Sequence, residues 1–349
     1  MGAHHAHTFA ALAGVTRLTI VDVDSDRAQT VAAEVGEALA TEAFVTSSGD
    51  IDAVLAAAAT AGGVPVDAMV IAAATPAHAP LIIAAAKAGI PALCEKPVAL
   101  DRADTDRALA AVAEAGTYLQ IGFQRRFDQG FMAARDAIAD GTLGDVHLIR
   151  LGTLDPAPPP LEYLRVSGGV FRDMHIHDFD AVRFVTGDEV VDVTTVGAVT
   201  VDAAIGELGD VDTTAVVLTM RSGALVVVSG CRQNPRGYDV RLEAIGSRDA
   251  ITVGLGERTP LRSVEPDGLL AEHRAGSGWD FFIDRFVDAY FAQAEAFVAA
   301  VAAGATGASD NPCSGDDGRA ALLLAIAAER SRATGQRVAL DTIVAEGAQ

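Results

Sequence analysis

The sequence predicts an α/β fold: a doubly wound, Rossmann-type parallel sheet followed by an α+β domain with a large, mostly antiparallel sheet. Short β-rich runs alternate with Ala-rich helical runs through residues 16–123, a rhythm typical of parallel sheets. After about Gly144, extended runs mostly follow one another without intervening helices. The chain has 349 residues, a length that suits two domains, and we predict these domains over 1–123 and 124–349. Half of the residues are hydrophobic, so a large core can be buried.

The first domain carries the start and stop signals of alternating elements. Ser25 and Asp101 suit helix N-caps, Gly36 and Gly116 suit helix ends, and Pro76 suits a first helical turn. The predicted strands cover 18–23, 43–46, 68–73, 92–95 and 118–123, and the predicted helices 1–13, 25–36, 51–61, 76–89 and 101–116. This order builds a parallel sheet with a helix between successive strands.

The second domain is predicted from β-rich runs separated by Gly, Pro and Asp turns. One helix, over 171–185, precedes these runs, and two helices, roughly 281–303 and 316–333, close the chain. The predicted strands cover 190–199, 213–220, 224–231, 240–245 and 250–253. A series of strands without crossover helices indicates antiparallel pairing.

Charge and cysteine content restrict the partners and the compartment. A net charge of -21 repels phosphate backbones and anionic lipids, so we expect neither nucleic-acid nor membrane binding, and a neutral or small substrate. Cys94, Cys231 and Cys313 lie far apart and form no C-x-x-C pair, and no secretory signal is visible. We therefore expect a cytoplasmic protein.

A complete dinucleotide-binding fingerprint consists of a strand, the glycine motif G-x-G-x-x-G, a helix, and an acidic residue about 20 positions after the glycines. The N-terminus of this chain carries only the last part of that pattern. Gly2 opens a helical run and suits the third glycine, and Asp22 ends the next strand and suits the ribose-hydroxyl acceptor. We expect the first strand and two glycines to lie upstream of Met1. A chain longer by about 10 to 15 residues should then be more soluble and bind NAD more tightly. The alternative is a helix in a fold without a glycine loop.

A lysine lies where a doubly wound sheet binds its ligands. Glu95-Lys96-Pro97 directly follows an apolar strand, and ligands bind outside the carboxyl ends of such strands. Pro97 removes a backbone donor and restricts Lys96 to extended geometry. The alternative is a surface lysine before a turn.

A second cluster of polar residues lies within residues 168–180. Asp173, His177 and Asp180 are spaced i, i+4 and i+7, which predicts that they line one helical face. A histidine flanked by two carboxylates is oriented and made more basic, as a general base requires. A salt-bridged solvent face explains the same spacing about equally well.

Histidines lie close together at two places in the sequence, and neither group has the spacing or the partners of a metal site. His175 and His177 point apart on a helix, whereas ligands four residues apart would share a face. His4, His5 and His7 have no acidic or cysteine partner nearby in sequence, which favours a tag remnant or an exposed helix. We expect no metal site.

Together these motifs resemble the Gfo/Idh/MocA oxidoreductase family, and within it the bacterial inositol 2-dehydrogenases. The likeness rests on Glu-Lys-Pro after a strand and on Gly-Gly-x-Phe-x-Asp-x-x-x-His-Asp-Phe-Asp in residues 168–180. It extends to residues 122–128, 154–163 and 236–239. The resemblance implies NAD as cofactor and oxidation of a cyclic polyol, foremost myo-inositol to 2-keto-inositol in inositol catabolism, by a homotetramer or dimer.

The resemblance also implies a role for each matching residue. Lys96 is similar to the lysine that hydrogen-bonds the reacting hydroxyl, and His177 is similar to the proton acceptor. Asp173 is similar to the aspartate that acts with this histidine in holding the substrate. The matching substrate-binding positions are Arg125, Asp155, Asp180 and Tyr238. The matching cofactor-binding positions are Gly2, Asp22, Ala74, Thr75, His78, Glu95, Lys96 and Pro97.

Three alternatives remain open. A dehydrogenase for a sugar or another cyclitol would share these motifs, because pocket loops set the substrate. A non-catalytic ligand sensor could use the same fold, although the presence of Lys96, Asp173 and His177 together argues against it. A chain without the first strand could also be an inactive fragment.

Overall fold

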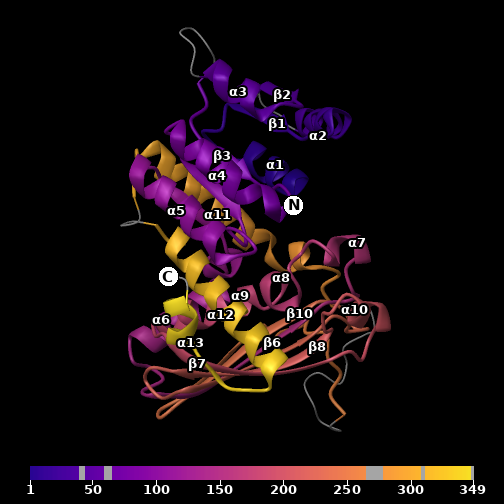
Figure 1. Cartoon of the computed structure of the whole chain (residues 1–349), viewed down its shortest axis with the longest axis vertical. Coiled ribbons are helices and arrows are strands. Elements are labelled where there is room, and N and C mark those ends of the chain that lie inside the picture. Colours follow the sequence, from indigo (N-terminus) through magenta and orange to yellow (C-terminus); the bar gives the residue numbers. More distant parts are fainter. Residues whose placement is uncertain (39–43, 59–64, 265–277, 308–310, 347–349) are drawn as a thin grey trace. The chain divides into compact units, whose positions relative to one another are not determined.

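Two compact units make up the chain (Figure 1). The computed structural model describes residues 1–38, 44–58, 65–264, 278–307 and 311–346. Unit 1 comprises Met1–Phe123 and Tyr290–Gly318, and unit 2 comprises Gln124–Ala289 and Arg319–Gln349. The predicted division between 123 and 124 differs from this arrangement because Tyr290–Gly318 belongs with unit 1. Residue 43 of a predicted strand and residues 59–61 of a predicted helix lie outside the described residues.

The strands of unit 1 are parallel and form two separate sheets. β1 (Arg17–Val21) pairs with β2 (Phe44–Ser48), while β3 (Met69–Ile71), β4 (Ala92–Glu95) and β5 (Leu119–Gly122) pair in that order. Among the described residues, β1 and β3 therefore each pair along one edge only. The parallel pairing of these strands confirms the prediction.

The helices of unit 1 follow the predicted order. They are α1 (Gly2–Ala10), α2 (Ser25–Ala38), α3 (Ile51–Ala58), the short 3-10 helix η1 (Thr75–Ala77), α4 (His78–Lys87) and α5 (Arg102–Ala115). The ends of α5 show how the sequence sets such bounds. The Asp101 carboxylate accepts a hydrogen bond from the Asp104 backbone N–H, and Gly116 ends the helix with a φ of 64° that favours glycine.

Helix α11 (Phe282–Ala302) explains why Tyr290–Gly318 belongs to unit 1. Its Phe297 is fully buried and packs edge-on against Phe9 of α1, with ring centroids 6.2 Å apart. Phe297 also lies 6.2 Å from the ring of Tyr118, which precedes β5. Three aromatic side chains from distant parts of the sequence thus share one core cluster.

Unit 2 is built on a seven-stranded sheet of order β11-β10-β6-β9-β8-β7-β12. Its strands are β6 (Val146–Leu154), β7 (Val190–Ala198), β8 (Thr213–Met220), β9 (Leu225–Cys231), β10 (Asp239–Gly246), β11 (Ala250–Val253) and β12 (Val338–Ala339). Among these described strands, β6 and β9 are parallel and all other pairs are antiparallel. The mostly antiparallel sheet is confirmed, but β6 and β12 were not predicted.

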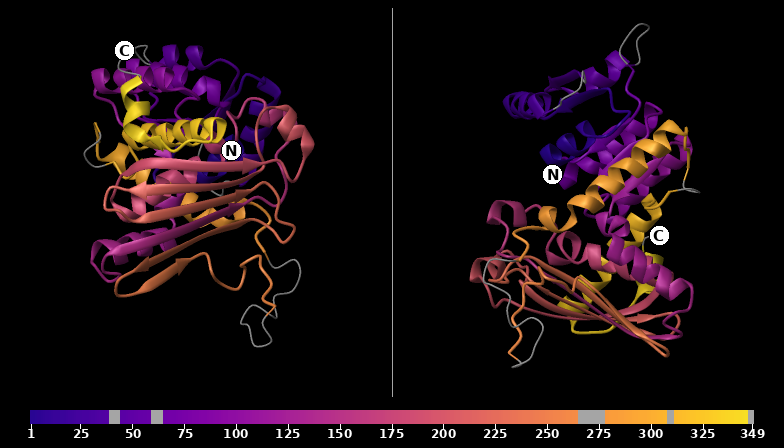
Figure 2. Two further views of the ribbon diagram at one scale, coloured as in Figure 1. Left: turned by 60° about the horizontal axis from the view of Figure 1, so that its bottom comes forward. Right: turned by 180° about the vertical axis from the view of Figure 1, so that it is seen from behind.

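The helices of unit 2 lie on one face of this sheet or at its edge (Figure 2). They are η2 (Gln124–Phe127), α6 (Gln129–Ala139), α7 (Leu161–Leu164), α8 (Val170–Asp173), α9 (Ile176–Thr186), α10 (Ala203–Glu207), α12 (Gly315–Thr334, from Arg319 on) and α13 (Leu340–Glu346). Burial alternates along the strands, so that Val216 and Leu218 are fully buried whereas Val217 between them is 40% exposed. The sheet therefore has one covered and one open face.

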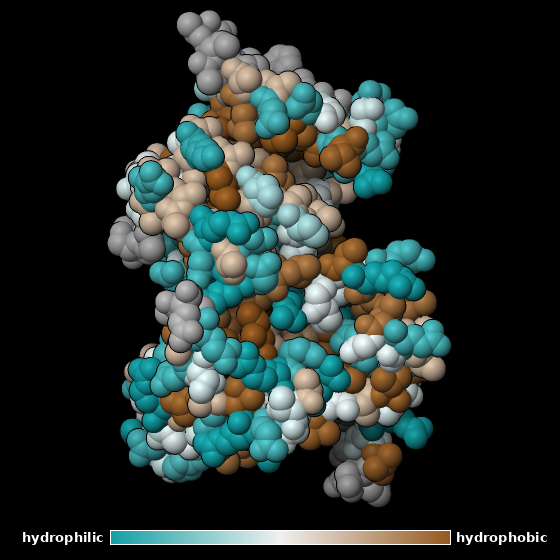
Figure 3. Space-filling view, viewed as in Figure 1, coloured by the Kyte–Doolittle hydropathy of each residue, from teal (hydrophilic) through white to brown (hydrophobic). Residues whose placement is uncertain are grey.

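The visible surface mixes hydrophilic and hydrophobic residues over both units (Figure 3). The sequence has 47 acidic and 26 basic residues, and such side chains remain at the surface unless they are paired. No helix in the described part of the chain is both long and apolar enough to cross a membrane.

Candidate active site

The predicted cofactor residues of unit 1 lie at the carboxyl ends of its parallel strands. Gly2 begins α1, and a Cβ on it would lie 3.9 Å from the Ala72 carbonyl oxygen, just after β3. Asp22 directly follows β1, and its Oδ2 lies 3.7 Å from Arg27 Nη1. Thr75 begins η1, after β3. Doubly wound sheets bind dinucleotides at this end, so the placement suits such a ligand.

His78 ties the loop after β3 to the turn after β4. Its Nδ1 lies 2.7 Å from the Pro97 carbonyl oxygen, and its Nε2 lies 3.0 Å from the Ala73 carbonyl oxygen. The side chain is 1% exposed, so these contacts hold the backbone next to Ala74 and Lys96. The Lys96–Pro97 peptide bond is cis. Two segments that the sequence assigns to the cofactor are thus joined.

His5 of α1 forms a buried pair with Glu95 that sequence analysis missed. Its Nε2 lies 2.7 Å from Glu95 Oε1, and both residues are buried. Burial raises the pKa of Glu95, but the hydrogen bond and charge of His5, with the charge of Lys96, outweigh it and lower that pKa. The expectation of an exposed helix is therefore wrong for His5. Burial also lowers the pKa of the neighbouring His4 to about 4.

The helix predicted over 171–185 is interrupted. α8 ends at Asp173, and α9 begins only after Met174 and His175. The continuous helix predicted over 171–185 is therefore wrong at Met174 and His175, and the single face predicted for Asp173, His177 and Asp180 stays a prediction. His175, at the break, is fully buried and makes polar contacts on both sides of its ring.

Asp155 and Asp173, both predicted site residues, are brought together by Arg232. Arg232 Nη1 donates to Asp173 Oδ2 at 2.9 Å and to Asp155 Oδ2 at 3.4 Å. The Tyr163 hydroxyl donates to the other Asp173 oxygen at 2.6 Å. Burial lowers the pKa of Arg232, but Asp173 and Asp155 outweigh it and raise that pKa. Arg232 thus remains a cation between two carboxylates.

Arg232 was not predicted as a site residue because β6 was not predicted as a strand. Asp155 directly follows β6 and Arg232 directly follows β9, and these strands pair in parallel up to their last residues. Tyr238 directly precedes β10, the antiparallel neighbour of β6. Three strand ends therefore meet at one edge of the sheet. The strand-end position of Arg232 was visible in the sequence, but its neighbours were not.

Arg125 lies in a buried network with Asp178, which sequence analysis also missed. Arg125 Nη1 donates to Asp178 Oδ1 at 2.5 Å, and Nη2 donates to Thr153 Oγ1 at 3.1 Å. Nδ1 of His175 lies 2.8 Å from the other Asp178 oxygen. Burial raises the pKa of Asp178, but Arg125 and His175 outweigh it and lower that pKa. Burial also raises the pKa of Tyr238. The positive charge of Arg125 acts in the opposite direction but is the smaller effect.

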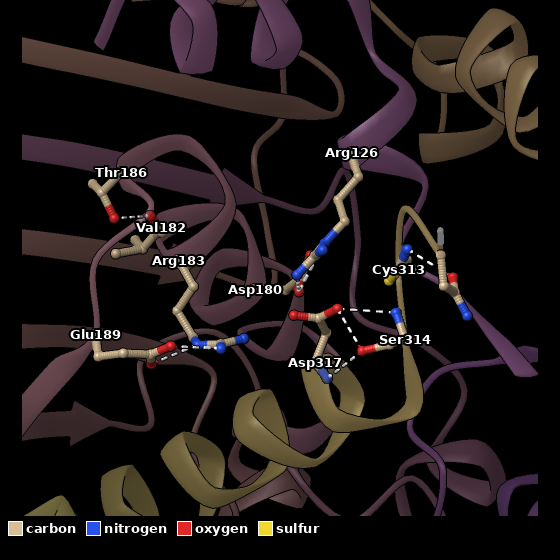
Figure 4. A network of polar contacts seen from close by, with 10 residues as sticks. Arg126, Asp180, Val182, Arg183, Thr186, Glu189, Cys313, Ser314 and Asp317 are labelled. Carbon is tan, nitrogen blue, oxygen red and sulfur yellow. Dashed lines mark hydrogen bonds and ion pairs between the residues drawn. The ribbon is translucent and has the colours of Figure 1, made fainter. Parts of the chain in front are cut away.

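Asp180 is buried and forms an ion pair with Arg126 (Figure 4). Arg126 Nη2 lies 2.7 Å from Asp180 Oδ1, and Nε lies 2.9 Å from Oδ2. This bidentate pair joins η2 to α9. His177, also on α9, is partly exposed. The assignment of Asp180 to substrate binding stays a prediction, and its carboxylate already has a protein partner.

The described residues contain no group of three or more His, Cys, Asp or Glu side chains arranged to hold a metal ion. In unit 2, buried arginines join Asp155, Asp173 and Asp178 instead. Carboxylates bound in this way are fixed acceptors, which suits the recognition of a ligand that donates several hydrogen bonds.

Comparison with known proteins agrees with this architecture. Residues 1–123 match the model of an oxidoreductase family with an NAD-binding Rossmann fold, and residues 131–252 match the GFO/IDH/MocA C-terminal domain. An inositol 2-dehydrogenase of Rhizobium meliloti is 38% identical over 340 residues, which cover 97% of this chain and 96% of the relative. A myo-inositol 2-dehydrogenase of Thermotoga maritima is 41% identical over 258 residues, 74% of this chain and 75% of the relative.

The fold of this chain is also similar to that of a solved structure. The myo-inositol dehydrogenase of Corynebacterium glutamicum has a TM-score of 0.83 at 32% identity, covering 97% of this chain and 95% of that chain. Fold, site and comparisons thus define an oxidoreductase with an NAD-binding Rossmann domain. The chain belongs to the Gfo/Idh/MocA family.

Proposed function

We propose that this chain oxidises a cyclic polyol with NAD, foremost myo-inositol to 2-keto-inositol. The observation that carries the proposal is the edge of the unit 2 sheet, where Asp155, Arg232 and Tyr238 meet. Carboxylates, a guanidinium and a phenol together bind a neutral ligand with many hydroxyl groups. The names of the relatives from Rhizobium meliloti and Thermotoga maritima support inositol as that ligand.

Unit 1 has the residues that would hold NAD. No side chain caps the start of α1 at Gly2, so its first N–H groups remain for the pyrophosphate. Asp22 would accept from a ribose hydroxyl. Ala74, Thr75 and His78 would line the cofactor on the β3 side, and Glu95, Lys96 and Pro97 on the β4 side. Bound NAD supplies the hydride acceptor.

The residues of the chain would handle the proton. Oxidation of a secondary alcohol removes a proton from oxygen and a hydride from carbon. We assign the proton to the imidazole of His177, and Lys96 would donate a hydrogen bond to the same oxygen and stabilise its developing negative charge. Asp173 would orient the substrate. Arg125 and Asp180 would fix the pocket through their ion pairs with Asp178 and Arg126.

A substrate panel tests the proposed function. We expect NADH formation with myo-inositol or a close stereoisomer, because fixed acceptors select the directions of several ring hydroxyls together. The measurement compares kcat/KM for cyclitols and aldoses under one condition. Turnover of aldoses alone would assign the chain to sugars, and binding without turnover of any panel member would support a sensor.

Asp22 predicts a preference for NAD over NADP. A carboxylate beside the ribose repels a 2′-phosphate, so kcat/KM with NAD should exceed that with NADP by at least about tenfold, the factor for roughly 1.4 kcal/mol. Asp22→Asn should reduce this ratio, whereas Asp26→Asn, an exposed carboxylate in the first turn of α2, should not. A preference for NADP in the unaltered chain contradicts the assignment.

The open sheet face in unit 2 supports a homo-oligomer, a dimer or tetramer. Val196 is 69% exposed, Leu225 46% and Val217 40%, and all three lie on strands of one sheet. Apolar side chains gathered on one face mark an interaction surface. Light scattering of the purified chain should give a multiple of 35.8 kDa, and a monomer at every concentration would contradict this.

We also propose a cytoplasmic location and a role in inositol catabolism. All three cysteines are free thiols, and two of them are buried, which suits a reducing compartment. Removal of hydride from a polyol suits the start of its breakdown. Cell fractionation tests the location, and recovery in an extracellular or envelope fraction would contradict it. Unimpaired growth on inositol after deletion of the gene would contradict the role.

A further inference from the structure

Arg232 is an almost fully buried cation among the proposed substrate residues of unit 2. Its side chain is 1% exposed, and it contacts carboxylates from two segments far apart in sequence, Asp155 after β6 and Asp173 at the end of α8. The charge of Asp210 acts on it as well. One guanidinium nitrogen, Nη1, serves both contacts.

The other nitrogens of Arg232 have remaining donor capacity. Nε and Nη2 are buried and have no hydrogen-bond partner among the described residues. A buried N–H without a partner costs about 1–3 kcal/mol, so such groups are kept where a water or a ligand satisfies them. An arginine that served only to hold two loops together would be expected to use these donors within the protein.

The geometry also explains why a cation is needed here. Asp155 and Asp173 bind the same nitrogen, so without Arg232 two carboxylates would lie close together and repel each other. Repulsion is relieved either by taking up a proton or by moving apart. Either change would remove a pair of oriented acceptors from the site.

We propose that Arg232 is a substrate-positioning residue, which holds Asp155 and Asp173 as paired acceptors for neighbouring ring hydroxyls and directs its free donors to an oxygen of the same ligand. The inference rests on the proposed function for its substrate class, a cyclic polyol. It adds a residue that none of the family motifs identified in the sequence contains.

Two substitutions and one control test this inference in the full chain. Arg232→Met keeps much of the volume but removes charge and donors, and we expect kcat/KM for myo-inositol to fall about 100-fold, with most of the loss in KM, while NAD affinity is unchanged. Arg232→Lys keeps the charge without the fork and should lose about tenfold. Arg150→Met, an exposed arginine on β6, should change neither parameter.

A chemical rescue separates positioning from structural support. Free guanidinium should restore part of the activity of Arg232→Met and none of that of Lys96→Ala. Unchanged kcat/KM in folded Arg232→Met would overturn the inference. So would a loss that follows a lowered unfolding temperature and is not rescued.

A crystal structure of Arg232→Met tests the positioning role of Arg232 without the substrate. The Asp155 and Asp173 side chains should leave their shared position in that variant. Unchanged positions would overturn the inference even if the chain oxidises inositol. If the unaltered chain oxidises no polyol, the proposed function fails, and separated side chains in Arg232→Met would still support the positioning role.

Discussion

Replacing Lys96 or His177 with Ala is expected to abolish most turnover without unfolding the chain. A general base contributes about 10²–10⁴-fold to the rate, so the loss of His177 should lower kcat by that range. Lys96 should have a comparable effect, because a cation aimed at a developing alkoxide stabilises charge that exists mainly in the transition state. Steady-state kinetics at saturating myo-inositol and NAD measure both losses.

The chain offers matched controls for these two substitutions. Lys87 at the end of α4 is exposed, and so is His147 on β6. Lys87→Ala and His147→Ala should retain full kcat. Losses below about tenfold in folded Lys96→Ala and His177→Ala would instead assign Lys96 to a surface turn and His177 to a solvent-facing helix.

Asp178→Ala is expected to produce the largest loss of stability among the polar substitutions, about 3–5 kcal/mol. The substitution leaves Arg125, which is 1% exposed, without its ion partner, and an uncompensated buried charge is strongly destabilising. His175 loses its acceptor as well. Chemical denaturation with circular dichroism gives the free energy of unfolding.

The control is the exposed pair of Arg150 and Glu243 on the same sheet. Glu243→Ala should cost only about 0–1 kcal/mol, because water screens this pair. The double variant Arg125→Met with Asp178→Leu should recover part of the loss, since no buried charge remains. Equal losses in Asp178→Ala and Glu243→Ala would contradict the buried network.

The buried ion pair of Arg125 and Asp178 also makes the stability of the fold depend on pH. The folded-state pKa of Asp178 is lower than its unfolded value, so the unfolded chain binds the proton more tightly. Its stabilising contribution is therefore complete well above pH 4 and is lost as the pH falls below about 4. Asp178→Ala should lack this part of the acid-induced loss.

Local signals in the sequence predicted most elements of unit 1 and the late strands of unit 2. Asp101 and Gly116 illustrate this, because a cap and a left-handed glycine act within their own helix end. β6 was missed although it alternates, with Arg150 outward and Ile149 and Leu151 inward. The alternation was sufficient to predict a strand here, whereas the pairing of β6 with β9 and β10 depends on the tertiary fold.

The candidate site was predicted residue by residue but not as a set of partners. His5 and Glu95 are 90 residues apart, and Arg232 and Asp173 are 59 apart. Pairs at such distances depend on the tertiary fold. The break between α8 and α9 was not predicted either, and His175 at this break contacts Asp178 and Thr214.

Transfer of deuterium from myo-inositol labelled at carbon 2 tests the central claim most directly. The chain should convert the labelled polyol and NAD to 2-keto-inositol and NADH that carries the deuterium at its nicotinamide ring, at a rate below that of unlabelled substrate. Formation of NADH without deuterium, or no NADH from any cyclitol by the folded chain, would contradict the account.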